Sequence, residues 1–141
     1  MVNVNVRQLL RSQERLLRRG DEAEKGGDRT TAGLLLFYSA ECGLKAGILR
    51  RRKARDTSQL PERTHDLRDL AKELRLPVSV QAAVMACKRR EKDTSVPGAD
   101  QPVAAKDLHQ AWRYGADLDP GEEQQALVAL RHLIEAARTC P

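Results

Sequence analysis

The fold is decided by residues 32–49, AGLLLFYSAECGLKAGIL, which run into the basic sequence RRRK at 50–53. Apolar side chains in this stretch fall on nearly every side of a helix, so we expect a central helix over about 31–53 that other helices cover on several sides. Gly43 and Gly47 lie one turn apart, and each would cost up to about 1 kcal/mol relative to Ala in a helix. Their presence favours the close approach of another helix at this point.

The composition around this stretch is that of a single all-α domain. A chain of 141 residues can bury about two-thirds of its unfolded surface, which is enough for one core. Only four aromatic residues occur, one Phe, one Trp and two Tyr, which favours helices over β-branched and aromatic strands. We therefore expect residues 1–141 to form one all-α domain.

Helix signals occur on both sides of the central stretch. The first helix is expected at about Val6–Glu24, where Gly26 and Gly27 close it. The last helix is expected to begin at Asp119-Pro120, because Asp119 is a good cap and proline fits the first helical position. The first helix and the central one are expected to form a tight helical hairpin.

Shorter helices are expected between the central and the last helix. They are a helix capped by Thr64, a helix capped by Ser79 that ends at Lys88-Arg89-Arg90, and a short helix at about 104–113. Residues 93–103 contain two prolines and a glycine, so we expect an exposed loop or insertion there.

The positive charge of the chain is concentrated in its first part. Residues 1–60 carry 13 Lys and Arg against 7 Asp and Glu, a net charge of +6, whereas residues 61–141 carry 12 against 13, a net charge of −1. This asymmetry predicts an acidic partner, such as RNA, a nucleotide or an acidic protein face, without choosing among them.

Neither a membrane span nor a disulfide framework is indicated. No uninterrupted run of about 18 apolar residues occurs, and the first residues do not resemble a secretion signal. Cys42, Cys87 and Cys140 are odd in number, scattered and free of CxxC spacing. We therefore expect a protein of the reducing cytoplasm that does not contact a membrane.

The common catalytic and metal-binding motifs are absent from the sequence. It contains no glycine-rich phosphate loop, no G-x-S-x-G elbow and no H-E-x-x-H helix. His109 and His132 have no Cys, Asp or Glu at a recognised ligand spacing, so we predict no metal and no cofactor.

The basic run at 50–53 has two interpretations. Its cations fall at the expected end of a helix, where they interact favourably with the helix dipole as a solvated surface. Alternatively, the run forms a phosphate-binding surface together with Lys88-Arg89-Arg90 and the arginines of the first helix, although no aromatic residue interleaves them.

Three ordered motifs resemble those of the HEPN superfamily of small helical domains. They are YSAECGLKAGIL at 38–49, Thr64-His65-Asp66-Leu67 at a helix start, and Arg113-Tyr114 near the last helix. The resemblance covers the chain from about residue 31 to the C-terminus. It implies a four- or five-helix up-and-down bundle, frequent homodimerisation, and binding of nucleotides or RNA, often beside a nucleotidyltransferase or another operon partner in toxin–antitoxin or defence systems.

Many HEPN members are metal-independent ribonucleases whose active site pairs an Arg with a His that follows after four to six residues. The positions that would hold this Arg are Ser, Gln and Leu at 58–60 before His65, Pro, Val and Ala at 102–104 before His109, and Gln, Ala and Leu at 125–127 before His132. The ribonuclease motif is therefore absent, and we predict no catalytic residue.

By its motifs the chain is similar to the non-catalytic, nucleotidyltransferase-associated HEPN type. The nucleotide- or RNA-binding residues that this resemblance and the basic run imply are Lys45, Arg50, Arg51, Arg52, His65, Asp66, Arg113 and Tyr114. Lys45 and Arg113 would engage phosphates, Tyr114 would stack or donate a hydrogen bond, and Asp66 would orient His65. The structural alternative pairs Lys45 with Glu41, places Tyr114 in the core and makes His65 cap its own helix.

These observations lead to three hypotheses. The first is a non-enzymatic HEPN-like domain that dimerises and binds a nucleotide, RNA or a cognate partner protein. The second is a divergent ribonuclease toxin in which His65 acts with a nearby arginine such as Arg63 or Arg68. The third is a purely structural dimerisation module in which the helix with Gly43 and Gly47 packs against a partner chain.

Overall fold

The computed structural model describes residues 2–60, 65–90 and 96–140, and in these ranges the chain is all-α with no β-strand. The elements are α1 (Val6–Lys25), α2 (Arg29–Arg52), η1 (Thr57–Gln59), α3 (Leu67–Glu73), α4 (Val78–Gln81), η2 (Ala105–Asp107), α5 (Leu108–Tyr114) and α6 (Pro120–Thr139), where η denotes a 3₁₀ helix. The predicted all-α class is confirmed.

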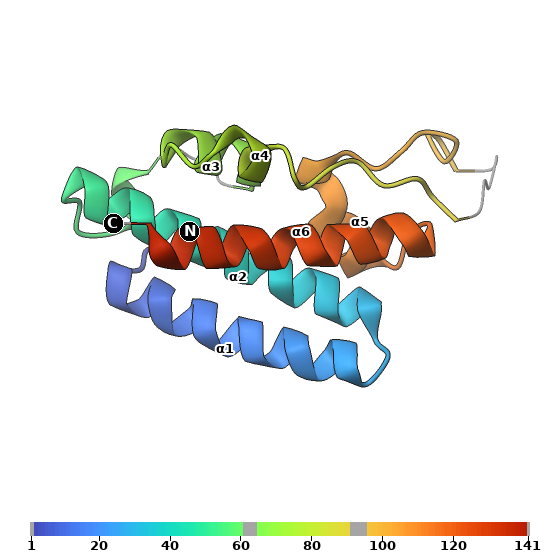
Figure 1. Cartoon of the computed structure of the whole chain (residues 1–141), viewed down its shortest axis with the longest axis horizontal. Coiled ribbons are helices and arrows are strands. Elements are labelled where there is room, and N and C mark those ends of the chain that lie inside the picture. The colour runs from blue at the N-terminus through green and yellow to red at the C-terminus, as the bar shows by residue number, and fades with distance from the viewer. Residues whose placement is uncertain (1, 61–64, 91–95, 141) are drawn as a thin grey trace.

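The helix α2 is the centre of the fold, with α1, α3, α5 and α6 in contact with it (Figure 1). Leu36, Phe37 and Leu44 are completely buried on this helix. By length and composition alone α2 could cross a membrane, but 72% of its apolar window is buried inside the fold. This burial is that of a core helix, as its apolar residues on all sides predict.

The two long neighbours of α2 run in opposite directions along it. Gly20 lies against Leu36 and Gln13 lies against Gly43, so α1 is antiparallel to α2. Arg29 contacts Glu123 near the start of both helices and Gly43 contacts Ala137 near their ends, so α6 runs parallel to α2. The chain must therefore return along the core between α2 and α6, and α3, α4 and α5 lie on this return path (Figure 1).

Glycines allow the neighbouring elements to approach α2 closely, as the sequence predicts. A Cβ at Gly43 would meet the side chains of Gln13 and Ala137, and one at Gly47 would meet Leu74 at 2.9 Å. Both surfaces are thus covered by the chain's own helices. The dimerisation hypothesis that places a partner chain on Gly43 and Gly47 is wrong in this respect, because these positions are already filled.

Polar side chains cap each of the three long helices, α1, α2 and α6, as well as the shorter α3. Asn5 and Gln8 form a capping box on α1, and Asp28 caps α2 by accepting a hydrogen bond from the amide of Thr31. Asp119 caps α6, with Pro120 in its first turn, as predicted. The cap of α3 is Asp66, so the prediction that Thr64 caps this helix is wrong; Thr64 itself lies outside the described residues.

The segment after α4 differs most from prediction. The expected helix capped by Ser79 is a single turn that begins after Pro77, and Lys88-Arg89-Arg90 does not end a helix. Instead the backbone of Cys87 exchanges hydrogen bonds of 2.9 and 2.7 Å with Val103. Distant backbone groups thus replace the local helical bonds that the sequence pattern favours.

The expected loop at 93–103 is largely exposed where the structure describes it, with Ala99 and Val103 as its buried residues. Residues 93–95 lie outside the described residues, and residues 97–100 form a turn in which Ala99 is buried. Val103, at the end of the expected loop, is buried at the pairing with Cys87. The expected short helix at 104–113 is η2 followed by α5.

Polar contacts fix the start of α6 to its neighbours. The carboxylate of Glu123 is buried and accepts a hydrogen bond of 3.1 Å from Nε1 of Trp112 in α5. Its other oxygen lies 3.2 Å from Nε of Arg29 in α2. Glu123 therefore joins three helices at one end of the core.

The contact between α2 and α5 provides a test of this core. A Cβ at Gly33 would overlap the indole of Trp112, and the indole is held in place by Glu123. We expect Gly33→Ala to lower the free energy of unfolding by about 1–3 kcal/mol, measured by urea denaturation. In Gly121→Ala, the control, the added Cβ makes only an ordinary 3.4 Å contact, and stability should be unchanged or slightly raised. Equal stability of both variants would contradict the close approach.

Candidate functional site

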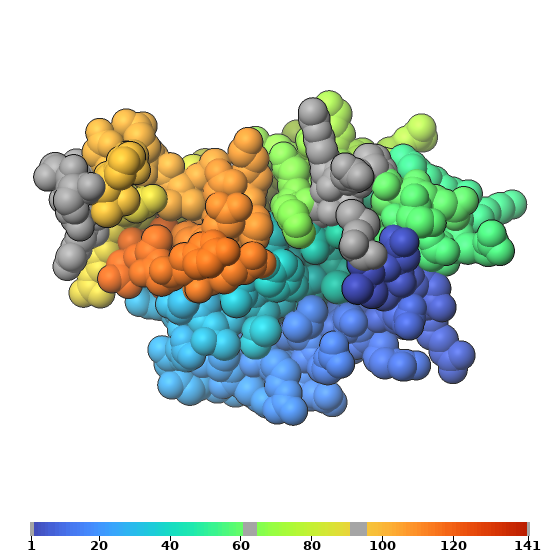
Figure 2. Space-filling model, turned by 180° about the vertical axis from the view of Figure 1, so that it is seen from behind, coloured from blue at the N-terminus to red at the C-terminus, as the bar shows by residue number. Residues whose placement is uncertain are grey.

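Four of the predicted site residues lie in one continuous row of side-chain contacts across α2 and α5. In order, this α2–α5 row consists of Lys45, Glu41, His65, His109, Tyr38, Arg113 and Tyr114. Figure 2 shows the neighbouring surfaces from behind, with the orange segment around α5 lying against the teal surface of α2. Residues that are up to 69 positions apart, such as Lys45 and Tyr114, are thereby linked.

The centre of the row is the pair of Glu41 and His65. Glu41 Oε1 lies 2.6 Å from His65 Nδ1, and Glu41 Oε2 lies 3.6 Å from Lys45 Nζ. Since an ionised carboxylate only accepts hydrogen bonds, Nδ1 of His65 carries the proton and donates it. Nε2 is then the ring nitrogen left for another partner, on a side chain that is 57% exposed.

His109 forms the buried wall behind this pair. Its ring stacks on that of His65, with centroids 5.1 Å apart, and lies 5.0 Å from the ring of Phe37. Burial lowers the pKa of His109 from its ordinary value of 6.5, and the neighbouring His65 lowers it further. Glu41 and Asp107 act in the opposite direction. A neutral His109 therefore supports His65 from behind near neutral pH.

The end of α5 carries the cationic and aromatic part of the row. The guanidinium of Arg113 lies 5.7 Å from the ring centre of Tyr38 and 5.8 Å from that of Tyr114, within the range of cation–π attraction. Tyr114 is 76% exposed, so the alternative that places it in the core is wrong. Gly115, in the left-handed conformation with φ of 77°, ends the helix directly after it.

Asp66 has a different role from the one predicted. Its carboxylate accepts hydrogen bonds from the amides of Arg68 and Asp69 and caps α3. Glu41, not Asp66, therefore orients His65. The alternative in which His65 caps its own helix is also wrong, because its ring nitrogen binds Glu41.

The arginines of the basic run lie at the end of α2 and serve the fold in part. Arg51 donates a hydrogen bond of 2.6 Å to the carbonyl of Leu74, which follows α3, and Arg52 forms an ion pair with Glu73. Arg50 is exposed and forms no ion pair among the described residues. Two of these three predicted binding residues thus tie α2 to the end of α3.

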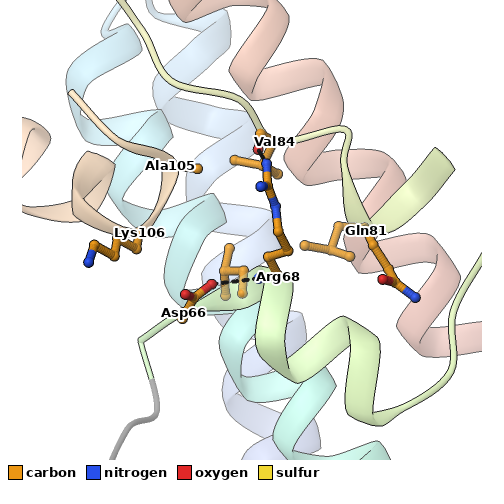
Figure 3. A pocket seen from close by; sticks show the side chains of 8 residues that line it. Asp66, Arg68, Gln81, Val84, Ala105 and Lys106 are labelled. Carbon is orange, nitrogen blue, oxygen red and sulfur yellow. Dashed lines mark hydrogen bonds between the residues drawn. The ribbon is translucent and has the colours of Figure 1, made fainter. Parts of the chain in front are cut away.

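The Arg68 side chain lines a small pocket beside Asp66. In Figure 3, Arg68 extends toward Val84, and its Nη2 lies 3.4 Å from that carbonyl oxygen. The pocket has a volume of about 10 Å³, room for about one water molecule, between α3, α4 and η2. Arg68 is thus engaged away from the Glu41–His65 pair, and Arg63, the other arginine of the ribonuclease hypothesis, lies outside the described residues.

Sequence reasoning missed three members of the row, Tyr38, Glu41 and His109, although a signal for them exists. Tyr38 and Glu41 precede the predicted Lys45 at intervals of three and four residues, which places all three on one face of the otherwise apolar α2. His109 and Arg113 are four residues apart on α5 in the same way. A polar stripe on a core helix is the pattern that would have found them.

The described residues contain no group of three or more His, Cys, Asp or Glu side chains that could hold a metal ion. The cysteines do not form disulfides, and burial raises the pKa of both Cys42 and Cys87 to about 11. These two thiols therefore stay protonated near neutral pH and are poor nucleophiles. The chemistry available in the row is that of His, Glu, Lys, Arg and Tyr.

The lowered pKa of His109 predicts a pH dependence of stability. As the pH falls below about 6.5, the unfolded chain takes up a proton on this ring while the folded chain resists it, so the contribution of His109 to stability is lost. We expect the free energy of unfolding to fall between pH 7.5 and 5.5, and to fall less in His109→Gln. His132→Gln, which removes an exposed imidazole from α6, is the control. Equal slopes for both variants in urea denaturation would contradict the prediction.

Comparison with family models, with curated proteins and with solved structures gives no match to this chain. The resemblance to HEPN domains therefore depends on the three sequence motifs.

Proposed function

We propose that this chain is a non-enzymatic HEPN-like domain that binds a phosphate-bearing ligand, a nucleotide or RNA, through the α2–α5 row. The observation that carries the proposal is that Lys45, His65, Arg113 and Tyr114 come from separate parts of the chain and join in one row of contacts. A purely structural role does not require an exposed histidine and an exposed tyrosine among such contacts.

The chemistry of the row suits a nucleotide. Arg113 is oriented by two aromatic rings and so presents its donors with less loss of side-chain freedom than a mobile arginine would. The exposed ring of Tyr114 offers a surface on which a base can stack. His65 offers Nε2 as a further hydrogen-bonding group, in a position that Glu41 determines.

The charge of α1 supports attraction of an anionic ligand. Arg7, Arg11, Arg15 and Arg18 are exposed on this helix, and none forms an ion pair among the described residues. Such unpaired charges raise the local concentration of anions and speed their association, and the effect weakens as salt is added.

The wider context of the proposal follows from the motif resemblance. It comprises an up-and-down HEPN-like bundle, a homodimer, a cytoplasmic location, and a nucleotidyltransferase or another cognate partner in a toxin–antitoxin or defence system. The antiparallel α1 and α2 and the long α6 support a bundle, whereas the single turn of α4 departs from one with four or five full helices.

Binding is tested by fluorescence anisotropy with labelled single-stranded RNA and labelled nucleotides at 50 and 200 mM salt. We expect binding that weakens with salt, and Arg113→Gln to reduce affinity about tenfold, because it removes a charge-assisted contact to phosphate. Lys72→Gln removes one exposed charge from α3 and should change affinity less than twofold. A signal absent at both salt concentrations would exclude nucleic-acid and nucleotide binding.

The Glu41–His65 pair favours a second candidate, cleavage of RNA. A histidine whose Nδ1 is held by a carboxylate can act as a general base through Nε2, and Lys45 on the same carboxylate adds a positive charge. This version of the ribonuclease hypothesis uses Glu41 and Lys45 in place of Arg63 or Arg68.

Cleavage is tested with labelled RNA in the presence of EDTA. If the second candidate is correct, His65→Ala should abolish cleavage, and Glu41→Gln should slow it by about 10²-fold or more, the scale of general base catalysis. His132→Gln should leave the rate unchanged. Cleavage that persists in His65→Ala would point to a contaminating ribonuclease and rule out this candidate.

A further inference from the structure

A groove of about 400 Å³ lies beside Tyr114, at the end of the α2–α5 row. Its lining includes Arg89, Gln101, Asp107, Gln110 and Tyr114. The groove is far larger than the pocket in Figure 3, and its volume is within the range of small-molecule sites.

The backbone that carries Arg89 is fixed on two sides. On one side Cys87 exchanges hydrogen bonds with Val103. On the other side the amide of Arg90 donates to Asp117, and the amide of Asp119 donates to Lys88, both across the Arg89–Leu118 bridge. The backbone from which the Arg89 side chain enters the groove is therefore held by the fold.

One donor of the Arg89 guanidinium, Nε, lacks an acceptor among the described residues. This Nε is buried and forms no hydrogen bond, and Arg89 forms no ion pair among the described residues, even though Asp107 lines the same groove. A buried donor of a charged group is costly when it is left unpaired, and most such groups in proteins have a partner. An anionic ligand in the groove would provide this partner.

Tyr114, which also lines the groove, offers a surface for a base. Tyr114 is 76% exposed, and Arg113 lies 5.8 Å from its ring centre. The amides of Gln101 and Gln110 provide both donors and acceptors in the same groove. A bare anion would need only Arg89, whereas this lining and this volume suit a ligand with a ring, hydroxyl groups and a phosphate.

From these features we infer that the groove binds a nucleoside monophosphate unit, with its phosphate on Arg89 and its base on Tyr114. The inference rests on the proposed function, because it names the ligand and adds Arg89 to the row. The Asp107 carboxylate then accepts from ribose hydroxyls and disfavours inorganic phosphate alone. The unit is either a free nucleotide or the phosphorylated end of an RNA.

The test is isothermal titration calorimetry of the full chain with AMP, adenosine and inorganic phosphate. We expect AMP to bind at least tenfold more tightly than either fragment. Arg89→Gln should weaken AMP binding about tenfold or more and bring it to the level of adenosine, since the charge-assisted phosphate contact is lost. Arg90→Gln, which removes the neighbouring exposed arginine, should change AMP affinity less than twofold. Unchanged AMP affinity in Arg89→Gln would overturn the inference.

A thermal-unfolding measurement separates a loss of AMP binding from a loss of stability in the Arg89 variants. Because the buried Nε of Arg89 has no acceptor among the described residues, Arg89→Met should have a Tm equal to or higher than that of the wild type without ligand, and should lose the rise in Tm that AMP causes. A lower Tm without ligand would mean that Arg89 serves the fold, and would overturn the inference.

The two proposals fail in different ways. If Arg113→Gln weakens AMP or RNA binding and Arg89→Gln does not, the row binds the ligand and the groove inference is wrong. If Arg89→Gln alone weakens binding, the groove is the site and the row is not. If a 5′-phosphorylated RNA trinucleotide depends on Arg89 and its 5′-hydroxyl form does not, the ligand is an RNA end. If the wild type binds none of these probes but binds longer single-stranded RNA in the anisotropy measurement, the groove inference is wrong and the proposed function stands.

Discussion

The burial of α2 on all its sides is the constraint on which the rest of the structure depends. Burying one large aliphatic or aromatic side chain contributes about 1.5–3 kcal/mol, and α2 carries five that are almost entirely buried: Leu36, Phe37, Leu44, Ile48 and Leu49. No single neighbour can cover a helix that is apolar all round. The antiparallel α1, the parallel α6 and the shorter α3 and α5 each take a part of its surface.

The candidate site lies on the part of α2 where contacts with α5 give way to contacts with the segment before α3. Along the polar stripe of α2, Tyr38 meets α5 through Arg113 and His109, whereas Glu41 meets His65, which precedes α3. A carboxylate as buried as that of Glu41 is tolerated because Lys45 and His65 each contact one of its oxygens. The same contacts that offset its burial also orient the exposed histidine, so stability and site geometry have one cause here.

Much of the helical framework could be predicted because its signals are local. These signals are the apolar run of α2, the glycines after α1 and the Asp119-Pro120 start of α6. Each depends on residues within a few positions of one another. The region from 78 to 104 could not be predicted, because the pairing of Cys87 with Val103 joins segments whose sequences do not signal each other. Local helix propensity favoured a longer α4, and this distant pairing prevailed.

The same distinction applies to the site. The motifs pointed to Lys45, His65, Arg113 and Tyr114, which the fold brings into one row, but they did not show that Glu41 and His109 connect them. Asp66 and His65 are neighbours in sequence, yet one caps a helix and the other turns toward α2. The partner of His65 is 24 residues away, and only the folded arrangement identifies it.

The parallel course of α2 and α6 also has a consequence for the order in which the chain folds. Contacts of α1 with α2, such as the hydrogen bond from Ser39 to Gln13, span 26 residues, whereas Arg29 and Glu123 are 94 residues apart. Closing the shorter loop costs less chain entropy, so we expect the α1–α2 hairpin to form first and α6 to dock last. Glu123 of α6 holds Trp112 in α5, next to Arg113. On this order, the aromatic end of the row is completed only in the final step of folding. Partial unfolding that releases α6 would then separate the residues of the site, while the α1–α2 hairpin remains folded.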